Sequence, residues 1–258
     1  MAKAENFLDV SAPGKKMERG HLHLLTQTIR NISAIFSALG FEIAFGPEVE
    51  TEFYNFDALN VPRDHPARDI QDTFWVKDFA ETVLRTHTSP VQIRYMLENK
   101  PPIRIIAPGK AFRNEATDAT HEAQFHQVEG LMVGEDISFA NLKEVLRIFF
   151  SRFFDAETAV RLRPGYFPFV EPGVEVDFSC FKCGGADKKC SLCKGVGWIE
   201  VMGAGMVHPN VLKSAGINPN KYQGFAFGGG LDRLAMLKHQ IDDIRLFYSG
   251  DLRFIKQF

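Results

Sequence analysis

The spacing of apolar residues along the chain predicts several helices. In the segment that ends at Gly40, the apolar positions step by three and four and share one helical face: Leu22, Leu25, Ile29, Ile32, Phe36 and Leu39. The same spacing predicts a helix from about Asn141 to Phe154, through Leu142, Val145, Leu146, Phe149 and Phe153. Ser89-Pro90 is typical of a cap followed by a first turn, and predicts a helix over about 90–99. The run LDRLAMLKH predicts a last helix.

Short alternating runs predict strands, namely FEIAF, IRIIAP, KAFR, FHQVEGLMV, VRLR, VEVDF, WIEVM and GFAF. In FHQVEGLMV, alternation places Phe125, Gln127 and Glu129 on one face. The strands come in clusters instead of alternating one by one with helices. We therefore expect an α+β fold in which helices flank an antiparallel sheet. Residues 60–78 are polar and contain prolines, which predicts a long loop of a length that is often functional.

Composition narrows the class of protein. With 258 residues, 45% of them hydrophobic, the chain can bury the core of one large domain, and its 24 Phe predict a Phe-rich core. The 30 Lys and Arg against 32 Asp and Glu leave no basic excess, so a nucleic-acid partner would need a local patch or another subunit. No run approaches the ~20 apolar residues of a membrane span, and the opening residues lack an export signal, so we expect a cytoplasmic protein.

The cysteines predict a metal site. Cys180, Cys183, Cys190 and Cys193 are spaced C-x2-C-x6-C-x2-C, and no other cysteine exists to form a distant bridge. In a chain without an export signal, this clustering favours metal over disulfides. Ligands at all four positions are typical of a tetrahedral structural zinc site. The nearby lysines could soften its charge or touch RNA, although plain solvation explains them more simply.

A charged segment, FRNEATDATHEAQFHQVE, lies between the apolar runs IRIIAP and GLMV and predicts a hairpin. An uncompensated buried charge costs several kcal/mol, so these side chains either form an internal salt-bridge network or wait for a charged ligand. A second segment, GFAFGGGLDR, runs from a strand through glycines into a helix, whose N-terminus favours anions. It fits neither a Walker A loop nor a dinucleotide fingerprint, and taken alone a glycine-rich turn packed on a neighbour explains it.

Together these segments carry a resemblance. F-R-x-E, then H-x3-F-x3-E, then G-G-G-L-D-R resemble motifs 2 and 3 of the class II aminoacyl-tRNA synthetases, and GFEIAFGPEVE resembles motif 1 with Pro47 in place. Over Asp9–Phe258 the chain resembles the alpha subunits of bacterial phenylalanyl-tRNA synthetases, through GHLHLLTQTIR, FDALNVPRDHPARDIQDTFW, RTHTSPVQIRYM, FHQVEG, YFPFVEP, GAGMVHPNVL, GFAFG and DLRFIKQF. The resemblance implies a linker over 1–15, a class II catalytic domain over 16–258 and a small zinc-binding insert over 180–197.

The implied function is that of a phenylalanine--tRNA ligase. Phenylalanine would react with ATP, together with Mg2+, to give phenylalanyl adenylate and pyrophosphate, and would then pass to the 3′-terminal adenosine of tRNA(Phe). The implied partner is a beta subunit, which carries proofreading in the family. Whether the chain forms a homodimer through motif 1 stays open.

The resemblance also implies which residues would hold ATP. Arg113 would hold the α-phosphate and Arg233 the far phosphates beneath adenine. Glu115 would bind the adenine amino group, and Phe125 would stack on the base. His121 would lie near the phosphates. Arginine suits this chemistry because its planar fork bonds two phosphate oxygens and stays ionised.

For the amino acid, the resemblance implies His87, Ser89, Gln127 and Glu129 around the α-ammonium and carboxylate. Further implied contacts are Phe167 and Phe169 edge to face with the substrate ring, Ala226 at the pocket floor, and Trp75 in a covering loop. Without the resemblance, each of these residues is explained as a core aromatic or a capping polar group.

The chain departs from the family pattern at two places. Gly229 stands where an apolar residue is usual and Asp232 where Glu is usual, which puts local rigidity in doubt. The family's alpha subunit normally begins with a coiled-coil arm that this chain lacks, so we expect weak tRNA binding, and activation that survives better than aminoacylation. Two rivals stay open: another class II synthetase or adenylate-forming ligase, and a non-catalytic paralogue that binds zinc or RNA.

Overall fold

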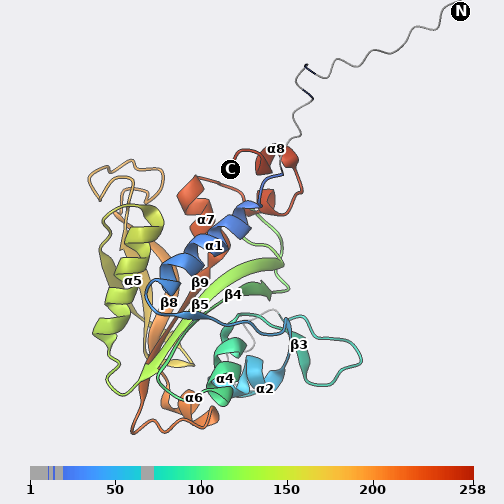
Figure 1. Ribbon diagram of the computed structural model, residues 1–258, viewed down its shortest axis with the longest axis vertical. Coiled ribbons are helices and arrows are strands. Elements are labelled where there is room, and N and C mark those ends of the chain that lie inside the picture. Colours follow the sequence, from blue (N-terminus) through green and yellow to red (C-terminus); the bar gives the residue numbers. More distant parts are fainter. Residues whose placement is uncertain (1–10, 12–13, 15–19, 65–72) are drawn as a thin grey trace, which may run out of the picture.

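A seven-stranded sheet runs through the computed structural model, which describes residues 11, 14, 20–64 and 73–258 (Figure 1). The strand order is β1-β4-β5-β9-β8-β7-β6, and every neighbouring pair is antiparallel except β1 with β4. The strands of this sheet are β1 (Glu42–Ile43), β4 (Ile103–Phe112), β5 (Gln124–Gly134), β6 (Val160–Phe167), β7 (Val170–Ser179), β8 (Trp198–Val207) and β9 (Gln223–Gly230). A second small sheet pairs β2 (Val49–Thr51) with β3 (Thr82–Leu84). The predicted α+β class is confirmed.

Helices cover both faces of the sheet (Figure 1). One face packs against α1 (Leu24–Ser37), α5 (Phe139–Phe154) and α7 (Leu231–His239). The other face packs against α2 (Glu52–Asn55), η1 (Asp57–Leu59), α4 (Ser89–Glu98) and α6 (Pro209–Ser214). The C-terminal η2 (Ile244–Phe247) and α8 (Leu252–Ile255) lie next to α7 and the start of α1.

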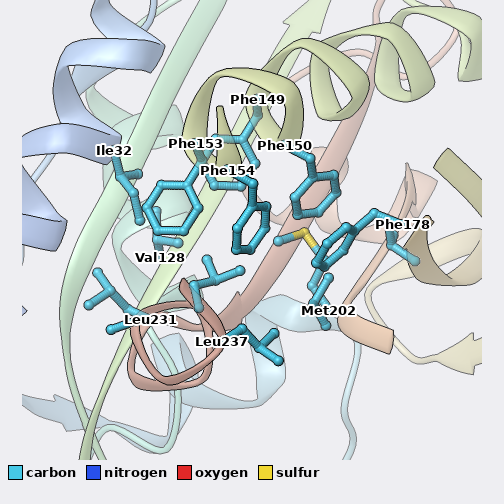
Figure 2. Packing of buried hydrophobic residues seen from close by; sticks show 14 of the residues in the cluster. Ile32, Val128, Phe149, Phe150, Phe153, Phe154, Phe178, Met202, Leu231 and Leu237 are labelled. Carbon is cyan, nitrogen blue, oxygen red and sulfur yellow. The ribbon is translucent and has the colours of Figure 1, made fainter. Parts of the chain in front are cut away.

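The predicted phenylalanine core is confirmed on the α5 side (Figure 2). Phe149, Phe150, Phe153 and Phe154 project from α5 toward the sheet and α7, and all four are buried. Phe178 of β7 stacks on two of them, with ring centroids 4.9 Å from Phe150 and 4.7 Å from Phe154. Such pairs add about 0.5–1.5 kcal/mol each beyond area burial.

Helix ends differ from the predictions where side chains cap the backbone. Helix α1 begins at Leu24, because the Nδ1 atom of His23 accepts the Leu25 N–H at 3.2 Å, and Leu22 stays 47% exposed before it. Helix α5 begins two residues earlier than predicted, because Ser138 and Asn141 form a reciprocal cap. Ser89 is the first helical residue of α4 and not its cap, a place that Thr88 takes.

Strand predictions were accurate in place and less so in extent. FEIAF yields only the two residues of β1, whereas IRIIAP and KAFR form one continuous strand, β4. The glycines of GFAFGGG continue β9 to Gly230, so the predicted glycine turn was wrong. Gly229 has a steric reason, because a Cβ there would lie 2.7 Å from both Met202 Cβ and the Val201 carbonyl oxygen.

Two predictions fall partly on residues that the structure leaves undescribed. Most of the predicted linker over 1–15 lies outside the described residues, as does 65–72 of the predicted loop. Among the helices that are described, none combines the length and the apolar character needed to cross a membrane.

Candidate active site

A cavity of about 530 Å³ opens on the sheet face that carries α4. Alternation along β5 directs Gln127 and Glu129 into it, as predicted, while Val128 packs in the phenylalanine core on the opposite face. His87 and Ser89, at the start of α4, line the same cavity. Four of the residues predicted to hold an amino acid therefore meet around one space.

Glu129 is the buried acid of this cavity, with 5% of its surface exposed. Its carboxylate accepts the Thr88 N–H at 3.1 Å and the Gln92 side-chain amide at 2.7 Å. Burial raises the pKa of this carboxyl, although donation from Ser89, Gln92 and Thr88 acts in the opposite direction. The acid thus lies at the N-terminus of α4, where the helix dipole favours negative charge.

Two polar atoms of the cavity wall lack a hydrogen-bond partner among the described residues, His87 Nδ1 and Gln127 Oε1. Burial lowers the pKa of His87 to about 3, and the positive charges of Arg113 and Arg85 act in the same direction. His87 is therefore neutral near pH 7. Buried polar atoms without partners are rare in native proteins, so these two indicate a polar ligand.

The rest of this cavity is apolar. Phe167 and Phe169 line it with ring centroids 6.0 Å apart, and Ala226 faces it from β9. Gly228, two residues after Ala226 on β9, is required, because a Cβ there would lie 2.6 Å from Glu129 Cγ. A space with one buried carboxylate and two phenyl rings suits a molecule that is charged at one end and apolar at the other.

A second cavity, of about 200 Å³, adjoins the first and shares Arg113, Glu115 and Gln127 with it. Its other lining includes His121, Phe125 and Arg233, so all five residues predicted to hold ATP border it. Arg113 comes from the end of β4 and Arg233 from the first turn of α7. The two arginines, distant in sequence, thus face one space.

Arg113 is held in place by three contacts, of which the one ion pair is long. Its Nε donates to the Thr86 carbonyl oxygen at 3.3 Å, its guanidinium carbon lies 5.0 Å from the Phe125 ring centroid, and Nη1 is 3.8 Å from Glu115 Oε1. Burial lowers the pKa of Arg113, which nevertheless stays charged, as arginine does in proteins. Within the described part of the chain, the side chain of Arg233 forms no hydrogen bond and no ion pair. This arrangement favours the charged ligand over the internal salt-bridge network.

Two predicted residues differ from the others, since His121 already has a carboxylate partner and Trp75 lies outside both cavities. His121 lies on the second cavity, with its Nδ1 atom 3.0 Å from Asp118 Oδ2. Trp75 is 55% exposed, forms an isolated bridge with Val83, and lines neither cavity. The structure therefore does not bring Trp75 together with the other residues predicted for the site.

Sequence reasoning missed Gln92, which lines the first cavity, and Arg85, which supports the strand beside it without lining either cavity. Gln92 follows Ser89 by three positions, a helical spacing that could have placed it beside Glu129. Arg85 is buried and donates to the carbonyl oxygens of Lys110, Gly46 and Pro47, at 2.7, 3.1 and 3.2 Å. It thereby ties the Gly46-Pro47 break to β4. No local pattern in the sequence marks this arginine.

The cysteines form a separate cluster at the far ends of β7 and β8, beside α5 (Figure 1). The four Sγ atoms lie within 4.8 Å of one another, with Cys180 and Cys190 at 3.8 Å and Cys183 and Cys193 at 3.5 Å. Tetrahedral zinc with Zn–S bonds of about 2.3 Å requires sulfur atoms about 3.8 Å apart. The donor set and its spacing therefore fit a zinc ion.

Comparison with known proteins agrees with this geometry. Residues 7–258 match the family described as tRNA synthetases class II core domain (F). The phenylalanine--tRNA ligase alpha subunit of Exiguobacterium sp. is 59% identical over 257 residues, covering 99% of this chain and 74% of that protein. The protein of the same name from Caldicellulosiruptor saccharolyticus is 57% identical over 251 residues, covering 97% and 73%. The one from Streptococcus agalactiae is 56% identical over 254 residues, covering 97% and 72%.

Proposed function

The chain belongs to the class II tRNA synthetase core domain family, and from this premise we propose that it is a phenylalanine--tRNA ligase catalytic domain. It activates phenylalanine with ATP and transfers it to the 3′-terminal adenosine of tRNA(Phe). The observation that carries this proposal is the pair of adjoining cavities, one with phenyl rings and a buried acid, the other with two arginines. The names of the similar proteins support phenylalanine over another amino acid.

Activation joins the two cavities at their shared wall. A carboxylate oxygen of phenylalanine bonds to the α-phosphorus of ATP while the bond to pyrophosphate breaks, which leaves the adenylate. The attacking group is already an anion, so the protein needs to align the reactants and offset the charge of the phosphates. Arg113 is our candidate for the α-phosphate, since it lines both cavities.

For the amino acid, we propose that Glu129 and Gln127 bind the α-ammonium group. His87 and Ser89 complete the polar end, and the unpartnered Nδ1 of His87 is available to a ligand. Phe167 and Phe169 surround the substrate ring, while Ala226 limits its length. Rejection of tyrosine by such an apolar pocket is limited to roughly a hundredfold, so proofreading by a partner would be useful.

For ATP, we propose that Phe125 stacks on adenine and Glu115 accepts from its amino group. Arg233 and His121 bind the far phosphates. Magnesium would bind together with the nucleotide, because protein sites hold this ion through one or two carboxylates and substrate phosphates. Glu122 is the candidate carboxylate, as it lines the second cavity. We propose that Trp75, which lines neither cavity, contacts the substrate only in a closed, substrate-bound state.

We propose structural zinc for the four cysteines, which form an insert over 180–197 within a catalytic domain over 16–258. The geometry of the sulfur atoms supports this assignment. A bound ion would be held by Cys180 and Cys183 from one end of the insert and by Cys190 and Cys193 from the other, and its role would be structural.

For partners, we propose a beta subunit that packs on the motif 1 segment, with a homodimer there as the alternative. Apolar side chains in and after that segment are exposed, most of all Phe45 at 78%, and with it Ile43, Val49 and Phe53. Exposed apolar clusters mark interfaces in soluble proteins. The cytoplasm is the proposed location, because charged tRNA is used there.

Pyrophosphate exchange with each of the twenty amino acids tests the proposal. We expect exchange that depends on phenylalanine and falls to background when Arg113 is replaced by Ala. A clear preference for another amino acid would identify a different class II synthetase. If the chain is folded and shows no exchange with any of the twenty amino acids, the result would favour the non-catalytic rival.

A further inference from the structure

Three residues close a buried hydrogen-bonded ring beneath the second cavity. Asp232 accepts the backbone N–H of His126 at 2.5 Å on one oxygen and the Tyr248 hydroxyl at 2.7 Å on the other. The Tyr248 oxygen in turn lies 3.0 Å from His126 Nδ1, and the two rings stack at 10°. Asp232 is 2% exposed and still borders the cavity.

The position of Asp232 follows from the end of a strand. The pairing of β5 with β9 stops at Gln127 and Gly230, where β9 turns into α7. The next backbone N–H of β5, that of His126, would be left without a partner on that side. The Asp232 carboxylate accepts this N–H in place of a backbone carbonyl of β9. It thereby fixes the first turn of α7 against β5.

The residue that follows Asp232 in this turn is Arg233. Its guanidinium is held by no described side chain, so its direction depends on how the turn is placed. The same carboxylate would repel a triphosphate if it rotated into the cavity that it borders. Holding Asp232 therefore both aims the arginine and keeps a negative charge away from the phosphates.

Tyr248 belongs to a C-terminal segment that reaches the other side of the cavity as well. Ile244 of η2 lines the cavity, and its N–H donates to the Ala119 carbonyl oxygen at 2.9 Å. Ala119 lies in the loop between β4 and β5 that carries His121. Further along, the Phe247 carbonyl oxygen accepts from His23 Nε2 at 2.8 Å. Residues 244–248 thus touch both the loop and α7.

Protonation of the ring follows from burial. Burial lowers the pKa of His126 to about 4, so its ring is neutral and donates Nδ1–H to the Tyr248 oxygen. Burial also raises the pKa of Tyr248, with the Asp232 charge acting in the same direction, so the hydroxyl keeps its proton. The chain of donation runs from His126 to Tyr248 to Asp232.

We propose that Tyr248 is a positioning residue for ATP: through Asp232 it holds the first turn of α7 and so aims Arg233 at the phosphates. Residues 244–248 act as a brace between that turn and the loop of His121. The inference rests on the proposed function and adds to it a support that lies outside the three motifs.

Tyr248→Phe tests it, since this change removes one hydroxyl and keeps the ring stack. We expect the KM for ATP in pyrophosphate exchange, and the Kd for magnesium ATP by calorimetry, to rise about tenfold, with the KM for phenylalanine within twofold. A tenfold change corresponds to about 1.4 kcal/mol, just below the range for a hydrogen bond to a charged group. Tyr95→Phe is the matched control, because the Tyr95 hydroxyl donates to Glu42 at 2.7 Å on the exposed surface, away from both cavities.

The control should leave all three constants unchanged. Unchanged ATP constants in Tyr248→Phe overturn the inference, even when its thermal midpoint falls, because the tyrosine is then merely structural. An equal rise in the KM for both substrates overturns it too, since that pattern is general loosening. A parent chain that binds ATP but shows no phenylalanine-dependent exchange rejects the proposed substrate, and the Kd comparison still decides the brace.

Discussion

Replacing Glu129 by Gln removes the buried negative charge of the amino-acid cavity and little else. The amide oxygen can still accept the Thr88 N–H, which lies 3.1 Å from the acid in the parent. The Gln92 amide, now 2.7 Å from the carboxylate, can turn its own oxygen toward the new NH2 group. The variant therefore isolates the charge that we assign to the substrate ammonium.

The expected loss follows from the type of bond. Hydrogen bonds to charged groups contribute about 1.5–3 kcal/mol, which is about 10- to 150-fold in affinity. We expect the KM for phenylalanine in pyrophosphate exchange to rise within that range, while the KM for ATP changes less than threefold. A phenylalanine KM within twofold of the parent would refute the role of Glu129.

The stability of the folded protein should increase in Glu129→Gln, although its affinity for phenylalanine falls. Burial raises the pKa of Glu129 above its ordinary 4.5, so between that value and the raised one the folded protein holds a proton that the unfolded chain releases. Stability is therefore lost as pH rises through this window and stays lower above it. Glu129→Gln should match or exceed the parent's thermal midpoint at pH 8.

Glu50→Gln provides the matched control for both measurements. Glu50 is equally buried, but it forms a two-point ion pair with Arg94, at 2.8 and 2.7 Å, outside both cavities. Its loss should lower the thermal midpoint and leave the KM for phenylalanine unchanged. If both variants behave alike, the buried charge of Glu129 is structural.

Four further outcomes are expected. Arg113→Ala should reduce exchange at least a hundredfold with an unchanged circular dichroism spectrum, because the shared wall of the cavities loses its cation. Gly228→Ala should raise the KM for phenylalanine more than that for ATP, since its Cβ would displace Glu129. Removal of metal by a chelator should lower the thermal midpoint by several degrees without changing either KM, at about 2–4 °C per kcal/mol. Finally, because burial lowers the pKa of His87 to about 3, stability in urea should fall as pH drops below 6.5, and His87→Gln should flatten that slope.

The periodicity of apolar residues located most of the fold. A helix or strand that buries one face repeats its apolar residues at a regular spacing, which can be identified in the sequence. Alternation along β5 assigned Gln127 and Glu129 to one side, and the structure places both in one cavity. Three-four spacing found α1 and α5 with errors of two residues at their starts. Those errors come from capping residues such as His23. A cap depends on a hydrogen bond between a side chain and the backbone, which the pattern of hydrophobic residues does not show.

The supports of the site could not be predicted in this way. Tyr248 and Asp232 are 16 positions apart, and Asp232 and His126 are 106 apart, so no local pattern links them. Gly229 looked like a loss of rigidity, whereas close approach of β8 requires glycine there. Residues that position another side chain, and that neither face the solvent nor belong to the apolar core, produce no periodic pattern in a single sequence.

The cysteine cluster and the reacting groups lie at opposite ends of β8, which carries Gly203 and Ala204 at the amino-acid cavity. Trp198 next to the insert and Gly203 are about 17 Å apart along an extended strand. Evolution can therefore shorten, swap or delete that cysteine-bearing tip as a separate part, while selection on substrate choice acts on the other end.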